Sequence, residues 1–378
     1  MRNEETGYRP LAGVRVVELA QNLAGPYCGL ILADLGADVV KVERPGGGDS
    51  ARSWGPPFVG GVGSIFAAAN RGKRSVVADV TSDGGRELVR RLVVHSDIVI
   101  EAFRPGALAR LGYDYETMRQ WNERIIYCSV LSYGEEGPLR ELPGYDPLMQ
   151  AHGGIMSVTG DAAGGAARVG TSIIDMGTGM WLAIAVLAAL RERDMSGAGT
   201  RLSVALYDTA LAWNAYHLTG YVETGIVPGP MGTELPMIAP YGAFPTVDGT
   251  LMLAPANDNL FARLCRAVGV GDLVGDERFG SNPQRVAHRD ELNRRISSAT
   301  QAFTTDALIQ LLRQAGVPCA PIQDMTQVAA DPQTHASGML TQDDGVAVAL
   351  PIRWNGVRNR PGGAPPAVGE HTAEVLND

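Results

Sequence analysis

A strand–helix–strand pattern at the start of the chain restricts the fold more than any other feature. Residues 14–19 and 38–43 are short runs rich in β-branched residues, and residues 27–36 between them are apolar. Pro26 precedes the apolar stretch and Gly36 closes it, as expected for the start and end of a helix. Two strands joined through a helix pair in parallel. The sequence therefore predicts an α/β fold with a parallel sheet.

The same alternation continues along the chain. It predicts further strands at 75–80, 97–103, 124–130 and 200–206, and helices at 84–95, 176–193 and 207–220. Residues 221–245 are rich in Gly, Pro and Met, which is typical of a connecting segment. A smaller α+β region follows, with β-rich runs at 241–244, 249–254 and 317–322 and helices at 259–268, 288–302 and 306–315.

Composition excludes several classes of protein. With 45% hydrophobic residues in 378, the chain can bury a core, and a net charge of −9 disfavours nucleic acid as a partner. The N-terminal ten residues lack the apolar core of a signal peptide, and the apolar run 180–190 is shorter than the roughly 20 residues of a membrane helix. The four cysteines have no metal-ligand spacing. We expect a cytoplasmic protein with no metal site and no membrane partner.

The strand–helix–strand start ends in Glu43, which raises the possibility of a dinucleotide site. However, the turn at 20–26 contains no GxGxxG, and the glycines at 46–48 follow the second strand rather than the first. An NAD-dependent dehydrogenase is therefore disfavoured.

Basic residues recur where the predicted strands end. Arg44 follows the second strand, Lys73 precedes the third, and Arg104 follows the fourth directly after Phe103. Ligands of open α/β sheets bind at the carboxyl ends of the strands, and guanidinium groups suit phosphates. The pattern predicts a nucleotide-containing, polyanionic ligand. Lys41 and Lys73 are the only lysines, so the other 30 of the 32 basic residues are arginines.

Asp175 has the most suggestive local position. It follows an apolar pair and precedes the long apolar helix predicted at 176–193. One interpretation is an N-cap, a position that Asp favours. The other is catalytic: a carboxylate kept ionised at a helix N-terminus and poorly hydrated can attack an acyl carbon. The residues alone leave both open.

Several segments, in order along the chain, resemble the class III CoA-transferases of the formyl-CoA and carnitine type. They are LAGVRVVELAQNLAGPYCGLILADLGADVVKVERPGGGDSAR at 11–52, NRGKRS at 70–75, DIVIEAFRPG at 97–106, DMGTGMWLAIAVLAALRER at 175–193, VPCAPI at 317–322 and GEHTAEVL at 369–376. The resemblance implies a Rossmann-like large domain, a smaller α+β domain and an interlocked homodimer. The corresponding boundaries are 1–200 for the large domain, 201–240 for a linker, 241–322 for the small domain and 323–378 for a segment that returns to the large domain.

The resemblance also implies the chemistry. It identifies Asp175 as a nucleophile that moves CoA between two carboxylic acids through an aspartyl-CoA thioester, with succinyl-CoA or another dicarboxylyl-CoA as a candidate donor. CoA is then a substrate, and no tightly bound cofactor is expected. The implied CoA-contacting residues are Arg44, Asn70, Lys73, Phe103, Arg104, Arg110 and Tyr145.

Two departures from the family pattern bear on the acceptor acid. The segment 229–234 lacks the glycine run of the oxalate-specific members, and Ala102 stands where Asn is common, so oxalate is disfavoured. Arg168 and the loop 229–238 are candidates for recognising a substrate carboxylate.

Two alternatives compete with the transferase. An α-methylacyl-CoA racemase on the same fold needs a second base, for which this sequence has Tyr145 at the motif position and His152 nearby. The other alternative is a CoA-binding protein without catalysis.

Overall fold

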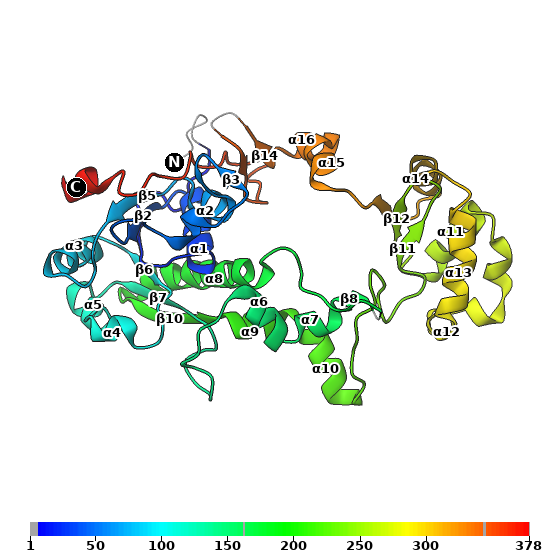
Figure 1. The fold of residues 1–378 in the computed structure, drawn as a ribbon, viewed down its shortest axis with the longest axis horizontal. Coiled ribbons are helices and arrows are strands. Elements are labelled where there is room, and N and C mark those ends of the chain that lie inside the picture. The colour runs from blue at the N-terminus through cyan, green and yellow to red at the C-terminus, as the bar shows by residue number, and fades with distance from the viewer. Residues whose placement is uncertain (1–6, 162, 343–344, 378) are drawn as a thin grey trace. The chain divides into compact units, whose positions relative to one another are not determined.

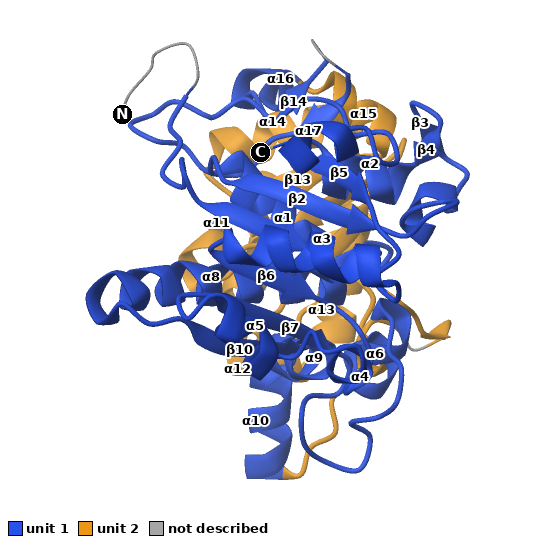
Figure 2. Ribbon diagram, turned by 90° about the vertical axis from the view of Figure 1, so that its left-hand side faces the viewer, with its two compact units in different colours: residues 1–155, 169–224, 332–378 blue, residues 156–168, 225–331 orange. Residues whose placement is uncertain are grey.

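The computed structural model describes residues 7–161, 163–342 and 345–377. The chain divides into two compact units (Figure 2). The large unit comprises residues up to Ile155, Val169–Thr224 and the chain from Pro332 onward, and the small unit comprises Met156–Arg168 and Gly225–Asp331. These boundaries differ from the predicted ones in several places. Residues 201–224, expected to be linker, belong to the large unit. The small unit takes in residues 156–168, the rest of the expected linker at 225–240, and residues 323–331, which were expected to return to the large domain.

The large unit is built on a six-stranded parallel sheet in the order β10-β7-β6-β1-β2-β5 (Figure 1). The strands are β1 (Arg15–Glu18), β2 (Asp38–Glu43), β5 (Arg74–Val77), β6 (Ile98–Glu101), β7 (Ile126–Leu131) and β10 (Thr200–Ala205). Numbered one to six along the chain, they lie in the order 3-2-1-4-5-6, that of doubly wound dinucleotide-binding sheets. The predicted large parallel sheet is confirmed.

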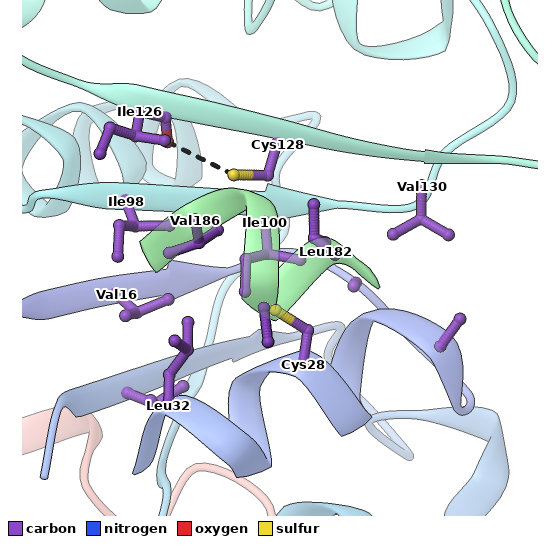
Figure 3. Packing of buried hydrophobic residues seen from close by; sticks show 14 of the residues in the cluster. Val16, Cys28, Leu32, Ile98, Ile100, Ile126, Cys128, Val130, Leu182 and Val186 are labelled. Carbon is purple, nitrogen blue, oxygen red and sulfur yellow. Dashed lines mark hydrogen bonds between the residues drawn. The ribbon is translucent and has the colours of Figure 1, made fainter. Parts of the chain in front are cut away.

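Alternate residues of a strand point to opposite faces of the sheet, and here both faces carry apolar side chains. Helices therefore cover both faces. Val16 packs on one side with residues of α1 (Ala24–Asp34) and α8 (Ile173–Ser196), as Figure 3 shows. Val17 packs on the other side with α3 (Asp83–Val94) and α5 (Tyr115–Trp121). The remaining helical segments of the large unit are η1 (Ser50–Ser53), α2 (Ser64–Asn70), α4 (Ala107–Arg110), α6 (Asp146–His152), α9 (Leu206–Trp213), α10 (Ala215–Thr224), α16 (Pro332–Ser337) and α17 (Thr372–Asn377), with α7 (Ile155–Val158) at the unit boundary.

Helix α8 is the one helix within the described ranges that is long and apolar enough, by length and composition, to cross a membrane. Leu182 and Val186 nevertheless lie in the core between the sheet and α1 (Figure 3). Packing on the sheet therefore accounts for one face of α8, while Trp181 and Ile184 on another face are exposed. Of the cysteines, Cys28, Cys128 and Cys265 are buried free thiols, and Cys319 is partly exposed.

The chain near the C-terminus covers the outer edge of the sheet at β5. The backbone N–H of His371 donates to Ser75 O, and the Ser75 N–H donates to His371 Nδ1. The Val77 N–H donates to the Thr372 hydroxyl. These bonds occupy edge groups that would otherwise be open to pairing with another strand.

The small unit contains a three-stranded antiparallel sheet of β11 (Gly242–Pro245), β12 (Thr250–Leu253) and β13 (Cys319–Pro321). Its helical segments are α11 (Asp258–Ala267), η2 (Gly271–Gly275), η3 (Glu277–Phe279), α12 (Asn282–Ala287), α13 (Arg289–Thr300), α14 (Thr305–Gln314) and α15 (Met325–Ala330). Leu251, Leu264 and Leu308 belong to its own hydrophobic core. Short two-stranded pairs complete the fold: β3 (Phe58–Val59) with β4 (Val62–Gly63), β8 (Gly160–Asp161) with β9 (Gly165–Ala166), and β14 (Leu340–Thr341) with β15 (Ala347–Val348).

Candidate active site at the carboxyl edge of the sheet

Asp175 lies inside the first turn of α8. The helix begins at Ile173, and Ser172 is the N-cap residue, without a side-chain capping bond. The N-cap interpretation of Asp175 is therefore wrong, and so is the predicted start of the helix at residue 176. Ile173 and Ile174 are helical although their β-branched side chains favour strands, because Ile174 is buried in the core.

The group that caps α8 comes from a distant part of the chain. Asp146, the first residue of α6, is buried, and its Oδ2 accepts the N–H groups of Ile174 at 2.8 Å and Asp175 at 3.3 Å. Its Oδ1 accepts Gln150 Nε2 at 2.6 Å. Sequence reasoning missed Asp146. The available signal was its place in Gly144-Tyr145-Asp146, directly before a proline at the start of a helix.

The environment of Asp175 disfavours its charge. Burial, followed by the negative charge of Asp146, raises the pKa of Asp175 from 3.8 to about 7. This corrects the expectation of a firmly ionised carboxylate, because desolvation outweighs the favourable helix N-terminus. Near neutral pH the group is divided between its two forms, and the ionised form is poorly hydrated. A carboxylate in that state is a stronger nucleophile than one in water.

The packing of α8 on α1 fixes where Asp175 lies. Both helices follow strands of the parallel sheet and lead from its carboxyl edge toward its amino edge, so they run in the same direction. A Cβ on Gly179 would lie 2.5 Å from Ala24 O and 3.1 Å from Cys28 N, so α8 touches the first turn of α1 (Figure 1). Asp175 is one turn earlier on the same face as Gly179. It therefore lies beside the loop 20–23 that follows β1, at the carboxyl edge where ligands of such sheets bind.

Several predicted CoA-contacting residues are accessible at this edge. Arg44 is exposed, and its Nε donates to Gly48 O at 2.9 Å. Phe103 and Arg104 line a pocket of about 440 Å³ at the ends of β6 and β7. Arg110 is exposed on α4 outside that lining, and Tyr145 is exposed as the N-cap residue of α6, next to Asp146. Their contact with CoA stays a prediction.

Asn70 and Lys73 have a different environment, because both are buried. Lys73 Nζ donates to Glu18 Oε2 at 2.8 Å, to Pro26 O at 2.8 Å and to Asn70 Oδ1 at 3.0 Å. An ammonium has three N–H donors, so these partners use all of them. A contact between Lys73 and CoA stays a prediction that would require one of these bonds to be exchanged.

His152 is poorly placed to act with Asp175. It is the last residue of α6, six positions after Asp146, which corresponds to about 9 Å along the helix axis. Its Nδ1 lies 3.2 Å from the Tyr133 hydroxyl, and its ring packs edge-on against Tyr133 and Tyr207. These contacts favour a packing role for His152 over that of a second base in a racemase.

The candidates for substrate-carboxylate recognition, Arg168 and the loop 229–238, belong to the small unit. Within the loop, Glu234 accepts from Arg289 Nη1 at 3.1 Å and from Asn293 Nδ2 at 2.8 Å, and Gly232 N–H donates to Gly160 O. These bonds order the loop on its own unit, and its role toward the substrate stays a prediction.

The fold is a doubly wound α/β fold, and Asp175 is a candidate reacting group at the carboxyl edge of its sheet. Residues 11–372 match the family model described as CoA-transferase family III. The chain is 41% identical to succinate–glutarate CoA-transferase from Agrobacterium fabrum, over 97% of this chain and 95% of the relative. It is 36% identical to acetyl-CoA:oxalate CoA-transferase from Acetobacter aceti, over 93% and 92%. A crystal structure of a CaiB/BaiF family protein from Brucella suis superposes with a TM-score of 0.89 at 41% identity, covering 98% of this chain and 99% of the other.

The chain therefore belongs to CoA-transferase family III, and it is an enzyme of the CoA-transferase type, as the resemblance implied. Enzymes of this type use CoA thioesters and carboxylates as substrates. The relatives named above act on different acids, so membership alone does not specify the acids used by this chain.

Proposed function

We propose that this protein transfers CoA between two carboxylic acids with Asp175 as the covalent nucleophile. The observation that carries the proposal is the position of Asp175: a poorly hydrated carboxyl with its pKa raised to about 7, in the first turn of α8 at the carboxyl edge of the sheet. The group can ionise at physiological pH, and its partly buried position limits the water that must leave before it reacts.

Each step conserves atoms and charge. The ionised Asp175 attacks the thioester carbonyl of the donor, the C–S bond breaks, and a mixed anhydride and CoA thiolate form. The thiolate then attacks the Asp175 carbonyl, which releases the donor acid as a carboxylate and leaves an aspartyl-CoA thioester. The acceptor carboxylate attacks this thioester, and the same steps in reverse give the new acyl-CoA and free Asp175. One acyl exchange is thereby divided into steps that each break a reactive bond.

Dicarboxylic acids of four or five carbons, with succinyl-CoA as donor, are the proposed substrates. The relative from Agrobacterium fabrum, named for succinate and glutarate, supports this choice at 41% identity. On the CoA side, Arg44, Phe103, Arg104 and Arg110 are the proposed contacts. Tyr145 lies beside the Asp146–Asp175 pair, and we place it at the reacting end of the substrate.

The test is to isolate the covalent intermediate. Incubation with succinyl-CoA and no acceptor should add the mass of CoA, less one water, to the peptide that contains Asp175, and glutarate should then discharge it as glutaryl-CoA. Asp175→Ala should form no adduct and show no turnover while still binding CoA. Full transferase activity in Asp175→Ala would reject the assignment, and CoA binding by the wild type without any adduct or turnover would favour a non-catalytic CoA-binding protein.

A further inference from the structure

The only two lysines of the chain meet in one fully buried ion cluster of the large unit. Glu18, the last residue of β1, accepts Lys41 Nζ on Oε1 at 2.9 Å and Lys73 Nζ on Oε2 at 2.8 Å. Lys41 Nζ also lies 2.9 Å from Asp49 Oδ2. The side chains of Glu18, Lys41 and Asp49 are completely buried, and Lys73 Nζ is enclosed with them. Two ammonium groups balance two carboxylates, so the cluster is neutral overall.

The cluster binds residues 20–26 at three points. This segment, called the loop 20–26 below, consists of the loop after β1 and the first three residues of α1. Lys41 Nζ donates to Ala20 O at 2.8 Å and Lys73 Nζ donates to Pro26 O at 2.8 Å. Between them, the Asn22 N–H donates to both carboxylate oxygens of Asp49 at 3.1 Å. Asn22 has a φ of 68°, a left-handed conformation that a non-glycine residue adopts at a cost. The cluster thus compensates for an unfavourable backbone conformation in the loop.

The start of α1, which forms the last part of this segment, is one of the parts of the fold that α8 contacts. Gly179 packs against Ala24 O, and Asp175 lies one turn earlier on the same face of α8, beside residues 20–23. Helix α1 also has no side-chain cap at its N-terminus. Its first N–H groups therefore have no capping side chain at the end nearest to Asp175.

We propose that Glu18, Lys41, Asp49 and Lys73 are positioning residues that keep the loop 20–26 in the conformation in which the Asp175 carboxylate and its substrate react. The proposal rests on the function proposed above and extends it to four residues that do not touch the reacting atoms. A buried ion cluster is a poor source of stability compared with apolar packing. The role of the ion cluster here is to hold the loop 20–26 in a single conformation.

The cluster works only while both lysines are charged. Burial, partly offset by Glu18, lowers the pKa of Lys73 from 10.5 to about 8. The pKa of Lys41 is raised, since Glu18 and Asp49 together outweigh burial, and that of Glu18 is lowered by the two lysines despite burial. Of the other groups near Lys73, Asn70 does not titrate, and the pKa of the Cys28 thiol is raised well above its usual value by burial. Lys73 is therefore the member that loses its proton first as pH rises.

A neutral amine at position 73 has two N–H donors for three acceptors, and it leaves the cluster with an excess negative charge. The wild-type rate of adduct formation at saturating succinyl-CoA should therefore fall as pH rises through about 8. The affinity for CoA should stay within about threefold over the same range. Lys73→Met should remove this alkaline decline, since it has no group that titrates there.

The variants Asp49→Asn and Glu18→Gln keep the shape of the cluster and remove one negative charge each, while Lys73→Met removes a positive charge. We expect each folded variant to lose at least tenfold in kcat with KM for succinyl-CoA changed by less than threefold. Hydrogen exchange at residues 20–26 should become faster at the same time. The matched control is Arg193→Met, which breaks the pair that Arg193 makes with Asp97 at 2.9 Å, at the other end of α8. It should lose stability but keep kcat and the slow exchange of residues 20–26.

Three results would overturn the proposal. A wild-type rate that stays flat from pH 7.5 to 10 would overturn the proposed dependence of the reaction on the titration of Lys73, whether or not any variant folds. A folded Lys73→Met enzyme with normal kcat and much weaker CoA binding would make Lys73 a direct CoA contact. Unchanged hydrogen exchange at residues 20–26 in Asp49→Asn would show that the cluster does not control the conformation of the loop. If the wild type transfers no CoA, the proposed function is wrong. Hydrogen exchange at residues 20–26 still tests whether the ion cluster holds the loop in place.

Discussion

At the scale of single residues, the ionised form of Asp175, the proposed nucleophile, lowers the stability of the fold. The folded state raises the pKa of Asp175 to about 7, against 3.8 without its environment. Between these values the unfolded chain has lost the proton that the native chain still binds, so the free energy of unfolding decreases as pH rises from about 4 to about 7. The ionised carboxylate therefore destabilises the fold above pH 7, and this cost is absent below about pH 4.

Asp175→Asn should accordingly raise the free energy of unfolding by about 1–3 kcal/mol at pH 7.5 and leave it nearly unchanged at pH 4. Urea denaturation at the two pH values measures the difference. Asp83→Asn is a matched control, since Asp83 occupies the first turn of α3 but is exposed. That change should cost a few tenths of a kcal/mol at pH 7.5 through the lost interaction with the helix dipole. Equal responses of the two variants would contradict the buried environment assigned to Asp175.

Asp146 affects the same titration from outside the reacting group. Its negative charge raises the pKa of Asp175, although less than burial does. Asp146→Asn should therefore move the acid limb of the pH–rate profile for adduct formation to lower pH. The change should also destabilise the protein by about 1 kcal/mol, because the N–H groups of Ile174 and Asp175 lose a charged acceptor. An acid limb that does not move would show that the charge of Asp146 does not affect the pKa of Asp175.

At the scale of helices and strands, the contact between α1 and α8 sets the position of Asp175, the proposed nucleophile. A Cβ on Gly179 would lie 2.5 Å from the backbone oxygen of Ala24, which has no flexible side chain to move aside. Gly179→Ala should destabilise the large unit by about 1–3 kcal/mol through overpacking and should lower kcat, since α8 must shift. Thermal unfolding and steady-state rates measure both effects. Gly84→Ala in α3 is the control, since a Cβ there meets nothing within 4 Å, and a neutral Gly179→Ala would show that α8 is free to move.

Periodicity located the six strands and α8 because apolar residues of these elements are buried in the hydrophobic clusters on the two faces of the sheet. It misplaced the start of α8, since Ile173 and Ile174 favour strands in isolation, and only tertiary packing makes them helical. The capping of α8 by Asp146 spans 28 residues of sequence, and local patterns carry no information about such a contact. The buried lysine cluster was missed for the same reason: a basic residue at a strand end is usually exposed, and only the fold brings Glu18 and Asp49 to Lys41 and Lys73.

At the scale of the whole molecule, the two units are formed from interleaved stretches of the chain. The segment 156–168 interrupts the large unit, and its Gly160 accepts the N–H of Gly232 from a segment that follows α10. The sequence indicated a connecting segment at 221–245, which corresponds to the exit from the large unit after Thr224. The sequence could not indicate that residues 156–168 belong to the small unit. This segment is short, and the residue with which Gly160 pairs lies about 70 positions later in the chain.

The large unit also exposes several large aromatic and aliphatic side chains on α8, α9 and α10. Trp181 and Ile184 on α8 and Trp213 at the end of α9 are at least 40% exposed, and the Trp181 and Trp213 rings lie 6.1 Å apart. Tyr216 on α10 is 57% exposed. Contiguous apolar patches of this kind mark interaction surfaces. Together with the interlocked dimer that the family resemblance implied, they support the proposal that this face is buried against a second copy of the chain.

The protein should therefore behave in solution as a dimer that does not dissociate on dilution, since an interlocked pair separates only by unfolding. Light scattering coupled to size exclusion should give twice the mass of one chain down to the lowest detectable concentration. Ile184→Glu places a charge on the exposed apolar face, and burying that charge between two chains would be costly, so this variant should yield monomer or aggregate. Arg119→Glu, on exposed α5 at the opposite face of the sheet, should leave the dimer intact. A well-folded wild-type monomer that retains full CoA-transferase activity would show that one chain is sufficient for the reaction.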